Sequence, residues 1–218
     1  MNAGLVLFLF AFSGLALSAV AQTTIHVPSD QPTIQAGVNA AQDGDTVLVA
    51  PGTYHENVVI QAKSITLTSG ATNSDQAANT IIEAPSPAAA VHIISSPHGL
   101  PPTVNLNGFT VTHTQGIQTT PTATGNGIQM EGGVSTIGGT IFTSNGVLGV
   151  ISNNLILNNP GCGFATFAAQ FTFEGNTVTS SSAGLCGFNQ GYLSNVAGPV
   201  AISGSLSVQI IDNKIVNN

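Results

Sequence analysis

Apolar and polar residues alternate in short runs along the chain from Thr24 onward. The first runs are Ile25–Val27, Thr46–Val49, Val58–Ile60 and Ile65–Thr68, and the gaps between them are short. Alternation with a period of two is typical of strands that bury one face. The pattern therefore predicts a chain built mainly from strands of three to five residues. The Ala-Pro-Gly-Thr sequence at 50–53 is expected to form a turn between two of them.

One segment has a helical pattern instead. Pro32 stands near the expected start of a helix, and Ile34 and Val38 follow at helical spacing. Gly44 is the expected stop. The pattern predicts a short helix within residues 32–43, and Ile34 and Val38 form its small apolar face.

Four later segments, residues 104–113, 150–159, 171–181 and 209–218, share one pattern. We align them on Phe109, Asn154, Asn176 and Asn213, and an apolar β-branched residue then follows two positions later, at Val111, Ile156, Val178 and Ile215. The step from Asn154 to Asn176 is 22 residues, which fits one coil of a solenoid, and the other steps, of 45 and 37 residues, fit two coils with insertions or deletions.

The aligned positions predict two ladders that run from coil to coil. The Val and Ile residues would stack inward as an aliphatic column. The Asn residues would occupy corners, because Asn tolerates a left-handed backbone and can bond its own turn. Residues 69–80 and 114–126, rich in Thr, Ser, Ala, Asn and Gly, are interpreted as loops. We predict an all-β, single-stranded parallel β-helix over residues 24–218 and no second domain.

The N-terminal stretch has the pattern of a secretory signal peptide. Gly4–Leu17 is apolar and uncharged, and Ala19 and Ala21 supply the small residues that precede a cleavage site. The apolar stretch is shorter than the ~20 residues that span a bilayer. We expect residues 1–21 to be removed and the mature protein to be secreted, periplasmic or held at the cell surface, without a membrane span. An uncleaved N-terminal anchor is the alternative.

Charged residues are rare: the chain has 2 Lys and Arg and 9 Asp and Glu, which make 5% of its residues and a net charge of -7. Ordinary globular proteins contain about 25%. Stacked coils explain the difference, because a charge repeated at equivalent positions ~4.8 Å apart would repel itself, whereas Thr, Ser, Asn and Gln can bond to their copies. So few basic side chains exclude nucleic acid and anionic lipid as partners.

Residues 32–60, PTIQAGVNAAQDGDTVLVAPGTYHENVVI, resemble the opening of pectin-lyase-like β-helix proteins such as pectin methylesterases. The resemblance implies a right-handed β-helix with a short N-terminal capping α-helix. Such a helix covers the open end of the stack, where unpaired strand edges would otherwise invite aggregation. Ile34 and Val38 would then be core-facing cap residues. Beyond residue 60 only the repeat pattern continues.

The catalytic motifs of these families are missing. Pectate lyases use an Arg base and calcium-binding Asp clusters, pectin methylesterases a Gly-x-x-Asp-Phe motif and an Arg, and polygalacturonases paired Asp and Gly-His-Gly. This chain has no Arg, and Pro97-His98-Gly99 is its nearest match to the last motif. Glycoside hydrolysis needs two carboxyl groups about 5–9.5 Å apart. No two are close in sequence among those after the cap: Asp75, Glu83, Glu131, Glu174 and Asp212. We expect no catalytic or metal-binding residues and no cofactor.

Cysteine and histidine offer two further candidates. Cys162 and Cys186 each begin a Cys-Gly-Phe sequence and lie 24 residues apart, about one coil. Neighbouring strands hold Cα atoms within disulfide range, and an exported protein meets oxidising conditions. A disulfide and a buried ladder with free thiols both fit. His92 and His113, 21 residues apart, could stack on adjacent coils, but a metal site needs at least three ligands, which favours a polar ladder.

Our first functional hypothesis is a carbohydrate-binding or cell-surface structural module in which a flat side lined by Thr, Asn and Gln meets polysaccharide. A fragment of a polysaccharide lyase or hydrolase of pectin-lyase-like fold is the alternative. The chain stops within a repeat at Asn218 without a visible C-terminal cap, so missing coils or a partner would cover that end. A periplasmic accessory protein of copper enzymes is a further alternative, disfavoured by two Met and scattered His.

Overall fold

The computed structural model describes residues 21–95, 100–114, 125–131, 134–137, 140–143, 146–167, 169–181, 183–189, 192–196 and 208–216. The predicted signal peptide, apart from Ala21, lies outside the described residues, and so does Pro97-His98-Gly99.

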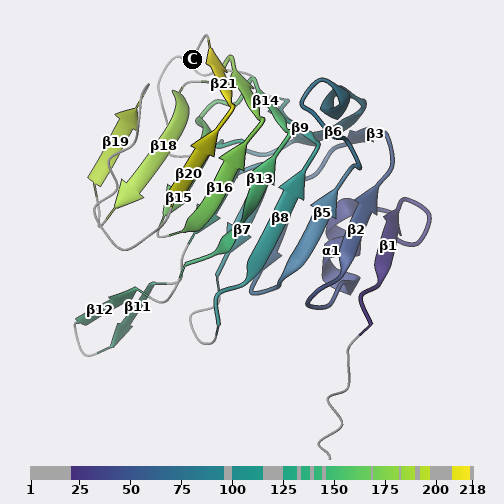
Figure 1. Ribbon diagram of the computed structural model, residues 1–218, viewed down its shortest axis with the longest axis horizontal. Coiled ribbons are helices and arrows are strands. Elements are labelled where there is room, and N and C mark those ends of the chain that lie inside the picture. Colours follow the sequence, from purple (N-terminus) through teal and green to yellow (C-terminus); the bar gives the residue numbers. More distant parts are fainter. Residues whose placement is uncertain are drawn as a thin grey trace, which may run out of the picture.

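Most described strands belong to three parallel sheets (Figure 1). Sheet A contains, in spatial order, β1 (Thr24–Val27), β2 (Thr46–Val49), β5 (Ile65–Thr68), β8 (Thr103–Asn107), β13 (Leu148–Ser152), β16 (Gln170–Glu174) and β20 (Val208–Ile211). Sheet B contains β3 (Gly52–Tyr54), β6 (Thr80–Ala84), β9 (Thr110–His113), β14 (Leu155–Leu157), β17 (Thr177–Thr179) and β21 (Lys214–Val216). Sheet C contains β4 (Val58–Gln61), β7 (Val91–Ile94), β10 (Ile128–Glu131), β15 (Cys162–Phe167) and β18 (Ala183–Asn189), with β19 (Tyr192–Val196) antiparallel at its edge.

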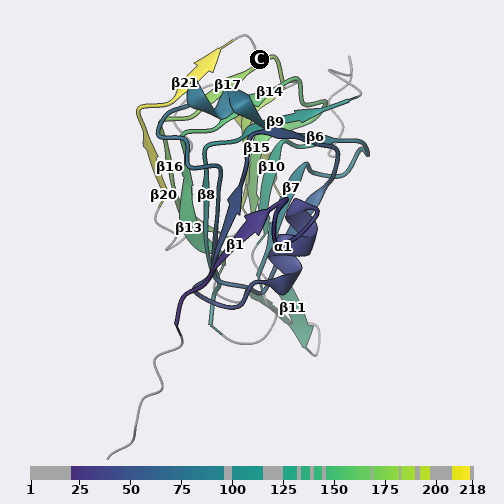
Figure 2. The ribbon, with the colours of Figure 1, turned by 90° about the vertical axis from the view of Figure 1, so that its right-hand side faces the viewer.

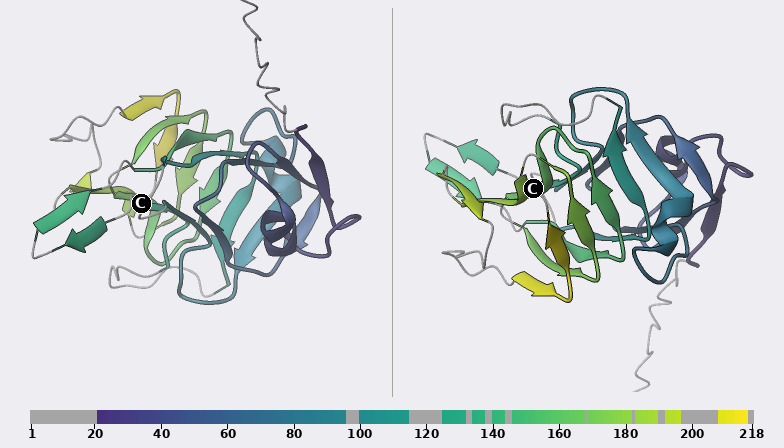
Figure 3. Two further views of the ribbon diagram at one scale, coloured as in Figure 1. Left: turned by 90° about the horizontal axis from the view of Figure 1, so that it is seen from below. Right: turned by 90° about the horizontal axis from the view of Figure 1, so that it is seen from above.

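The chain visits the three sheets in rotation (Figure 2). It runs through β2, β3 and β4, then through β5, β6 and β7, and repeats this path; we call one such passage a coil. Each coil therefore adds one strand to each sheet, and the stack extends from β1 and the helix α1 (Ile34–Ala40) at one end to β20 and β21 at the other (Figure 3). This arrangement is consistent with a parallel β-helix.

Alternation within each strand sends every second side chain into the core. In sheet A, the column Val47, Leu67, Leu106, Ile151 and Phe173 is in register from β2 to β16, and each member is fully buried. In sheet B, the predicted column Val111, Ile156, Val178 and Ile215 is likewise in register. Ile215 is 37% exposed, because no described strand follows β21 in that sheet.

The four repeated segments each form the corner between sheets A and B. The first strand of a segment belongs to sheet A and the second to sheet B, as in β8 and β9 or β16 and β17. The steps of 45 and 37 residues were assigned wrongly to two coils: β9 pairs directly with β14, and β17 with β21, so each is one coil. Insertions lengthen these coils. One contains the antiparallel hairpin of β11 (Val134–Ile137) and β12 (Thr140–Thr143), and the other contains β19.

The aligned asparagines form a buried ladder at this corner. The Oδ1 of Asn176 accepts from the backbone N–H of Asn154 at 2.9 Å, and its Nδ2 donates to the carbonyl of Ile151 at 2.8 Å. Asn154 and Asn213 make the equivalent bonds to Phe109 and Asn176. The ladder residues thus bond the neighbouring coil, and Asn213 also bonds its own turn as predicted, because its Nδ2 donates to the carbonyl of Ile211 at 2.9 Å.

The left-handed backbone lies one position earlier than predicted. The residues before the four aligned positions, Gly108, Asn153, Gly175 and Asp212, have φ between +51° and +83°. The residue with the left-handed backbone makes the bend, and the side chain of the aligned residue that follows it can then point inward. Gly is suited to the bend because it lacks a Cβ, and Asn and Asp tolerate it better than other residues.

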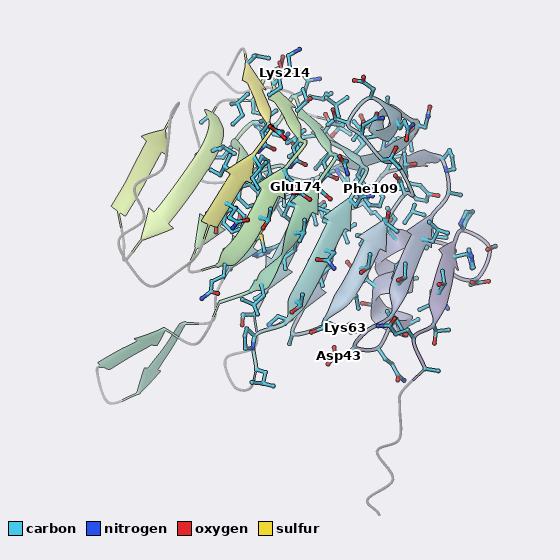
Figure 4. All side chains as sticks on the ribbon, viewed as in Figure 1. Asp43, Lys63, Phe109, Glu174 and Lys214 are labelled. Atoms are coloured by element: carbon cyan, nitrogen blue, oxygen red, sulfur yellow. A yellow bond between two sulfur atoms is a disulfide. The ribbon has the colours of Figure 1, made fainter. Side chains whose placement is uncertain are left out.

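The helix α1 covers the N-terminal end of the stack, and three long side chains hold it there. It begins at Ile34, after the N-cap Thr33, and is shorter than predicted; Ile34 and Val38 are buried as expected of cap residues. Glu56 accepts from the first two N–H groups of the helix at 2.9 and 2.8 Å. Lys63 donates to carbonyls at the helix C-terminus, at 2.8 and 3.1 Å (Figure 4). Each charge thus faces the helix end that it stabilises.

Gln35 completes the cap by acting as a partner for an edge strand. Its Oε1 accepts from the N–H of Val59 at 2.7 Å, and its Nε2 donates to the carbonyl of the same residue at 3.0 Å. These are the backbone groups of β4 that a further strand would bind. Gly52 and Thr53, predicted to lie in a turn, belong to β3 and pair with β6.

Asp45 binds the backbone immediately before β1 and should make the stability of the fold sensitive to acid. Its carboxylate accepts from the backbone N–H groups of Gln42 and Thr23, both at 2.8 Å, and these bonds hold the pKa of Asp45 below its usual value. A lowered pKa in the folded state contributes stability above the unfolded pKa of about 4, and this contribution is lost as the pH falls through the lowered value. We expect Asp45→Asn to be less stable than wild type at pH 7, and the difference in stability to shrink as the pH falls through the lowered pKa of Asp45.

Urea unfolding at a series of pH values measures this gap. Asp75→Asn is the matched control, since Asp75 is exposed and its side chain makes no cap hydrogen bond. A gap between wild type and Asp45→Asn that stayed constant with pH would contradict the assignment.

The segment 69–79 packs against the stack instead of leaving it as a predicted loop. It contains the 3-10 helix η1 (Gln76–Asn79), and the carbonyl of Ala77 accepts from the hydroxyl of Thr110 at 3.0 Å. The carbonyl of Ala71 accepts from Asn107 at 2.8 Å. The segment covers the outer side of β9, and this explains why Thr110 and Thr112 are buried.

Candidate functional site

Four long connections flank strands of sheet C. Residues 95–102 follow β7, residues 114–127 precede β10, residues 132–147, which include the β11–β12 hairpin, follow β10, and residues 190–207, which include β19, follow β18. The corners between sheets A and B after β8, β13, β16 and β20 are two residues long, and the longer corner after β5 contains the segment 69–79. Insertions in solenoids gather on one face, which is often the binding face. The position of the insertions therefore directs attention to the outer face of sheet C.

Two rows of side chains lie on this outer face, in register across neighbouring strands. The first row contains Val59, His92, Gln129 and Ala165, of which Ala165 is fully buried, and the second contains Gln61, Ile94 and Glu131. The residues that alternate with them, Val58, Ile60, Val91, Ile93, Ile128 and Met130, are fully buried in the core. The strands thus hold the outer rows on a rigid base, as a binding site requires.

Four residues form a connected polar group here, which we call the Glu131 cluster: Asn126, Gln129, Glu131 and His92. The Nδ2 of Asn126 donates to the Oε1 of Gln129 at 2.8 Å, and the Nε2 of Gln129 donates to the Oε1 of Glu131. The Nε2 of His92 lies 3.2 Å from the Oε2 of Glu131, but the two are not aligned for a hydrogen bond. Both oxygens of the carboxylate therefore have a polar neighbour from the protein.

A buried member of the cluster, Asn126, binds the cluster to the backbone of the neighbouring strand β15. Asn126 is only 5% exposed, and its Oδ1 accepts from the backbone N–H of Cys162 at 2.9 Å. Glu131 and His92 remain open to solvent, with side chains 33% and 26% exposed. The chain of bonds from Cys162 through Asn126 and Gln129 fixes the carboxylate while leaving part of it accessible.

No lysine balances this carboxylate. Lys63 is bound to the end of α1, and Lys214 lies on β21 in sheet B (Figure 4). The chain has no other lysine and no arginine. The accessible groups of the Glu131 cluster are thus mainly hydrogen-bond acceptors.

The outer face of sheet A has the Thr and Asn composition predicted for a sugar-binding side. Its central residue, Asn107, donates to Thr68 at 3.1 Å and accepts from Ser152 at 3.1 Å and from Asn153 at 2.9 Å. These polar groups bind one another along the stack. We therefore interpret this face as a structural ladder, with Glu174 at the end of β16 as its acidic member.

Two further histidines each lie beside a carboxylate, His26 beside Asp30 at 3.0 Å and His55 beside Glu83 at 2.9 Å, and the other titratable residues are dispersed. His92 and His113, expected to stack, lie on different sheets, and so do Glu131 and Glu174. His113 is buried, and its ring nitrogens each lie 2.8 Å from an acceptor, the carbonyl of Ala88 and the Oδ1 of Asn159. Among the residues that the structure describes, no three His, Cys, Asp or Glu are placed to hold a metal ion.

Cys162 and Cys186 are joined by a disulfide. The expectation that they face each other in register was wrong: Cys162 pairs with Ala183, and Cys186 pairs with Ala165. The coil step between β15 and β18 is 21 residues, so the cysteines, 24 residues apart, are offset by three positions. Their Cα atoms are 6.0 Å apart, within the range of disulfides.

Removing this disulfide should destabilise the fold moderately. It closes a loop of 24 residues, which corresponds to about 3 kcal/mol of chain entropy in the unfolded state. We expect the Cys162→Ala, Cys186→Ala double variant to unfold at a lower urea concentration than the oxidised wild type. Reduced wild type should resemble the variant, and equal midpoints for oxidised and reduced protein would contradict the prediction.

No protein-family model, curated protein or solved structure matches this chain. The likeness to pectin-lyase-like proteins therefore depends on residues 32–60 alone. Among the described residues, none of the helices has the length and apolar character needed to cross a membrane.

Sequence reasoning considered Glu131 only as one of a carboxylate pair, and it missed Asn126 and Gln129. Gln129 and Glu131 are two positions apart in the strand sequence IQME, so they share one face. That spacing could have identified the two residues as outward neighbours. His92 could not have been added without the register of β7 against β10.

Proposed function

We propose that this protein is an exported carbohydrate-binding module, and that it binds polysaccharide on the outer face of sheet C. We further propose that it is a right-handed parallel β-helix of pectin-lyase-like type. Right-handedness is supported by the general preference of parallel crossover connections, which are right-handed in about 98% of cases. Export is supported by the signal-like sequence at residues 1–21 and by the disulfide.

The Glu131 cluster is the observation that carries the proposed function. Sugar hydroxyls are strong donors, and a fixed carboxylate beside a histidine ring offers acceptors that are already oriented. Hydrogen bonds to charged groups contribute about 1.5–3 kcal/mol each, more than bonds between neutral groups. The ladder residues of sheet A are less suited to this role, because Asn107 is already bonded by its neighbours.

Replacing Glu131 with alanine should weaken polysaccharide binding by about tenfold or more, the loss expected for one charge-assisted hydrogen bond. The measurement is binding of the purified protein to a panel of plant, algal and microbial polysaccharides, with dissociation constants for any that bind. Glu174→Ala is the matched control, since it removes the same carboxylate from a half-buried strand position on sheet A.

Loss of binding in Glu174→Ala with retention in Glu131→Ala would move the site to sheet A. A lyase or hydrolase is the competing function. Release of reducing ends or unsaturated products from polygalacturonate, alginate or xylan by the isolated chain would favour it over a binding module.

A further inference from the structure

The charges around the Glu131 cluster carry information about the kind of glycan that fits there. Polymers of uronic acid bear one carboxylate per sugar, and proteins that bind them need cations to balance it. On the described outer face of sheet C, His92 is the single residue that can carry a positive charge, and it already lies beside Glu131. Lys63 and Lys214 are placed elsewhere.

Glu131 cannot easily move away from an incoming ligand. Gln129 donates to its Oε1, and Asn126 fixes Gln129 through a bond of 2.8 Å. Asn126 is itself buried and accepts from the backbone of β15. A ligand carboxylate that approached this face would therefore meet a fixed like charge, while a hydroxyl would find a fixed acceptor.

We propose that Glu131 makes this face selective for uncharged, hydroxyl-rich glycans and excludes polymers of uronic acid. The inference rests on the proposed function, and it names the ligand class of the same site. The net charge of -7 acts in the same direction at longer range.

A matched pair of polymers tests the inference: polygalacturonate and the galactan obtained from it by reduction of its carboxyl groups. The two share a backbone and differ only in charge. At low ionic strength we expect the neutral polymer to bind about tenfold more tightly, because like charges at contact distance repel each other, and more strongly near a protein surface than in bulk water. The ratio of the two dissociation constants should fall toward one as salt screens the repulsion.

The Glu131→Gln variant separates charge from shape. It keeps an oxygen that can accept from Gln129 but removes the negative charge. Discrimination between the two polymers should fall toward a ratio of one, while Glu174→Gln, the matched change on sheet A, should leave it unchanged.

Three results would decide against the inference. Tighter binding of polygalacturonate than of its reduced form would overturn it while leaving a carbohydrate-binding function in place. Equal discrimination by wild type and Glu131→Gln would remove Glu131 as its cause. Failure to bind either polymer or any other glycan of the panel would overturn the proposed function itself.

Discussion

Replacing Gly149 with alanine should prevent stable folding. Gly149 lies in β13, in the middle of sheet A, and pairs with Val104 on one side and Phe171 on the other. A Cβ built on Gly149 would overlap the carbonyl oxygen of Val104. The obstacle is backbone, so no rotamer change can relieve it; β8 and β13 would have to separate. We expect a loss of at least about 3 kcal/mol, at the upper end of what overpacking costs.

Circular dichroism and urea unfolding would measure this loss. Val150→Ala, at the next position of the same strand, is the control: Val150 is half-buried on the outer face, so its truncation should cost much less. A Gly149→Ala protein with wild-type stability would mean that β8 and β13 are not packed in this register.

Asn176→Ala should destabilise the fold by about 2–5 kcal/mol. The change removes the acceptor for the buried N–H of Asn154 and the donor for the buried carbonyl of Ile151. Each backbone group left without a partner in the interior costs about 1–3 kcal/mol. Asn176→Asp should also be damaging, because it keeps the acceptor, loses the donor and places a charge in a site that is 1% exposed.

Chemical unfolding of the variants tests the Asn ladder. Asn158→Gly is the control, because Asn158 is exposed and has a φ of +54°, which glycine adopts without strain. Near-equal midpoints for Asn176→Ala and Asn158→Gly would show that the ladder contributes little to stability.

Much of the fold was predictable because local rules decide it. Strand alternation gave the inward column that includes Val111 and Val178, and this follows from the two-residue period of any strand. The cap followed from helical spacing of Ile34 and Val38. The coil count was not predictable from spacing, because an insertion of any length between β10 and β13 leaves the pairing of β9 with β14 intact.

The candidate site was less predictable, since it depends on register between strands far apart in sequence. His92 and Glu131 belong to β7 and β10, and their neighbourhood is created by the pairing of His92 with Gln129. The disulfide shows the same limit: a difference of three residues between the coil step and the cysteine spacing changes which residues face each other. Composition and motif spacing contain no information on such offsets.

The cap contacts have a consequence for the order in which the chain folds during synthesis. Glu56, Val59 and Lys63 supply the partners of α1 from positions only 21 to 25 residues away in sequence. Closing loops of this length costs little more entropy than closing shorter ones. The first coil can therefore close soon after Lys63 emerges, and each later strand then meets an edge that is already formed. We expect the growing chain to use its own N-terminal end as a template, coil by coil.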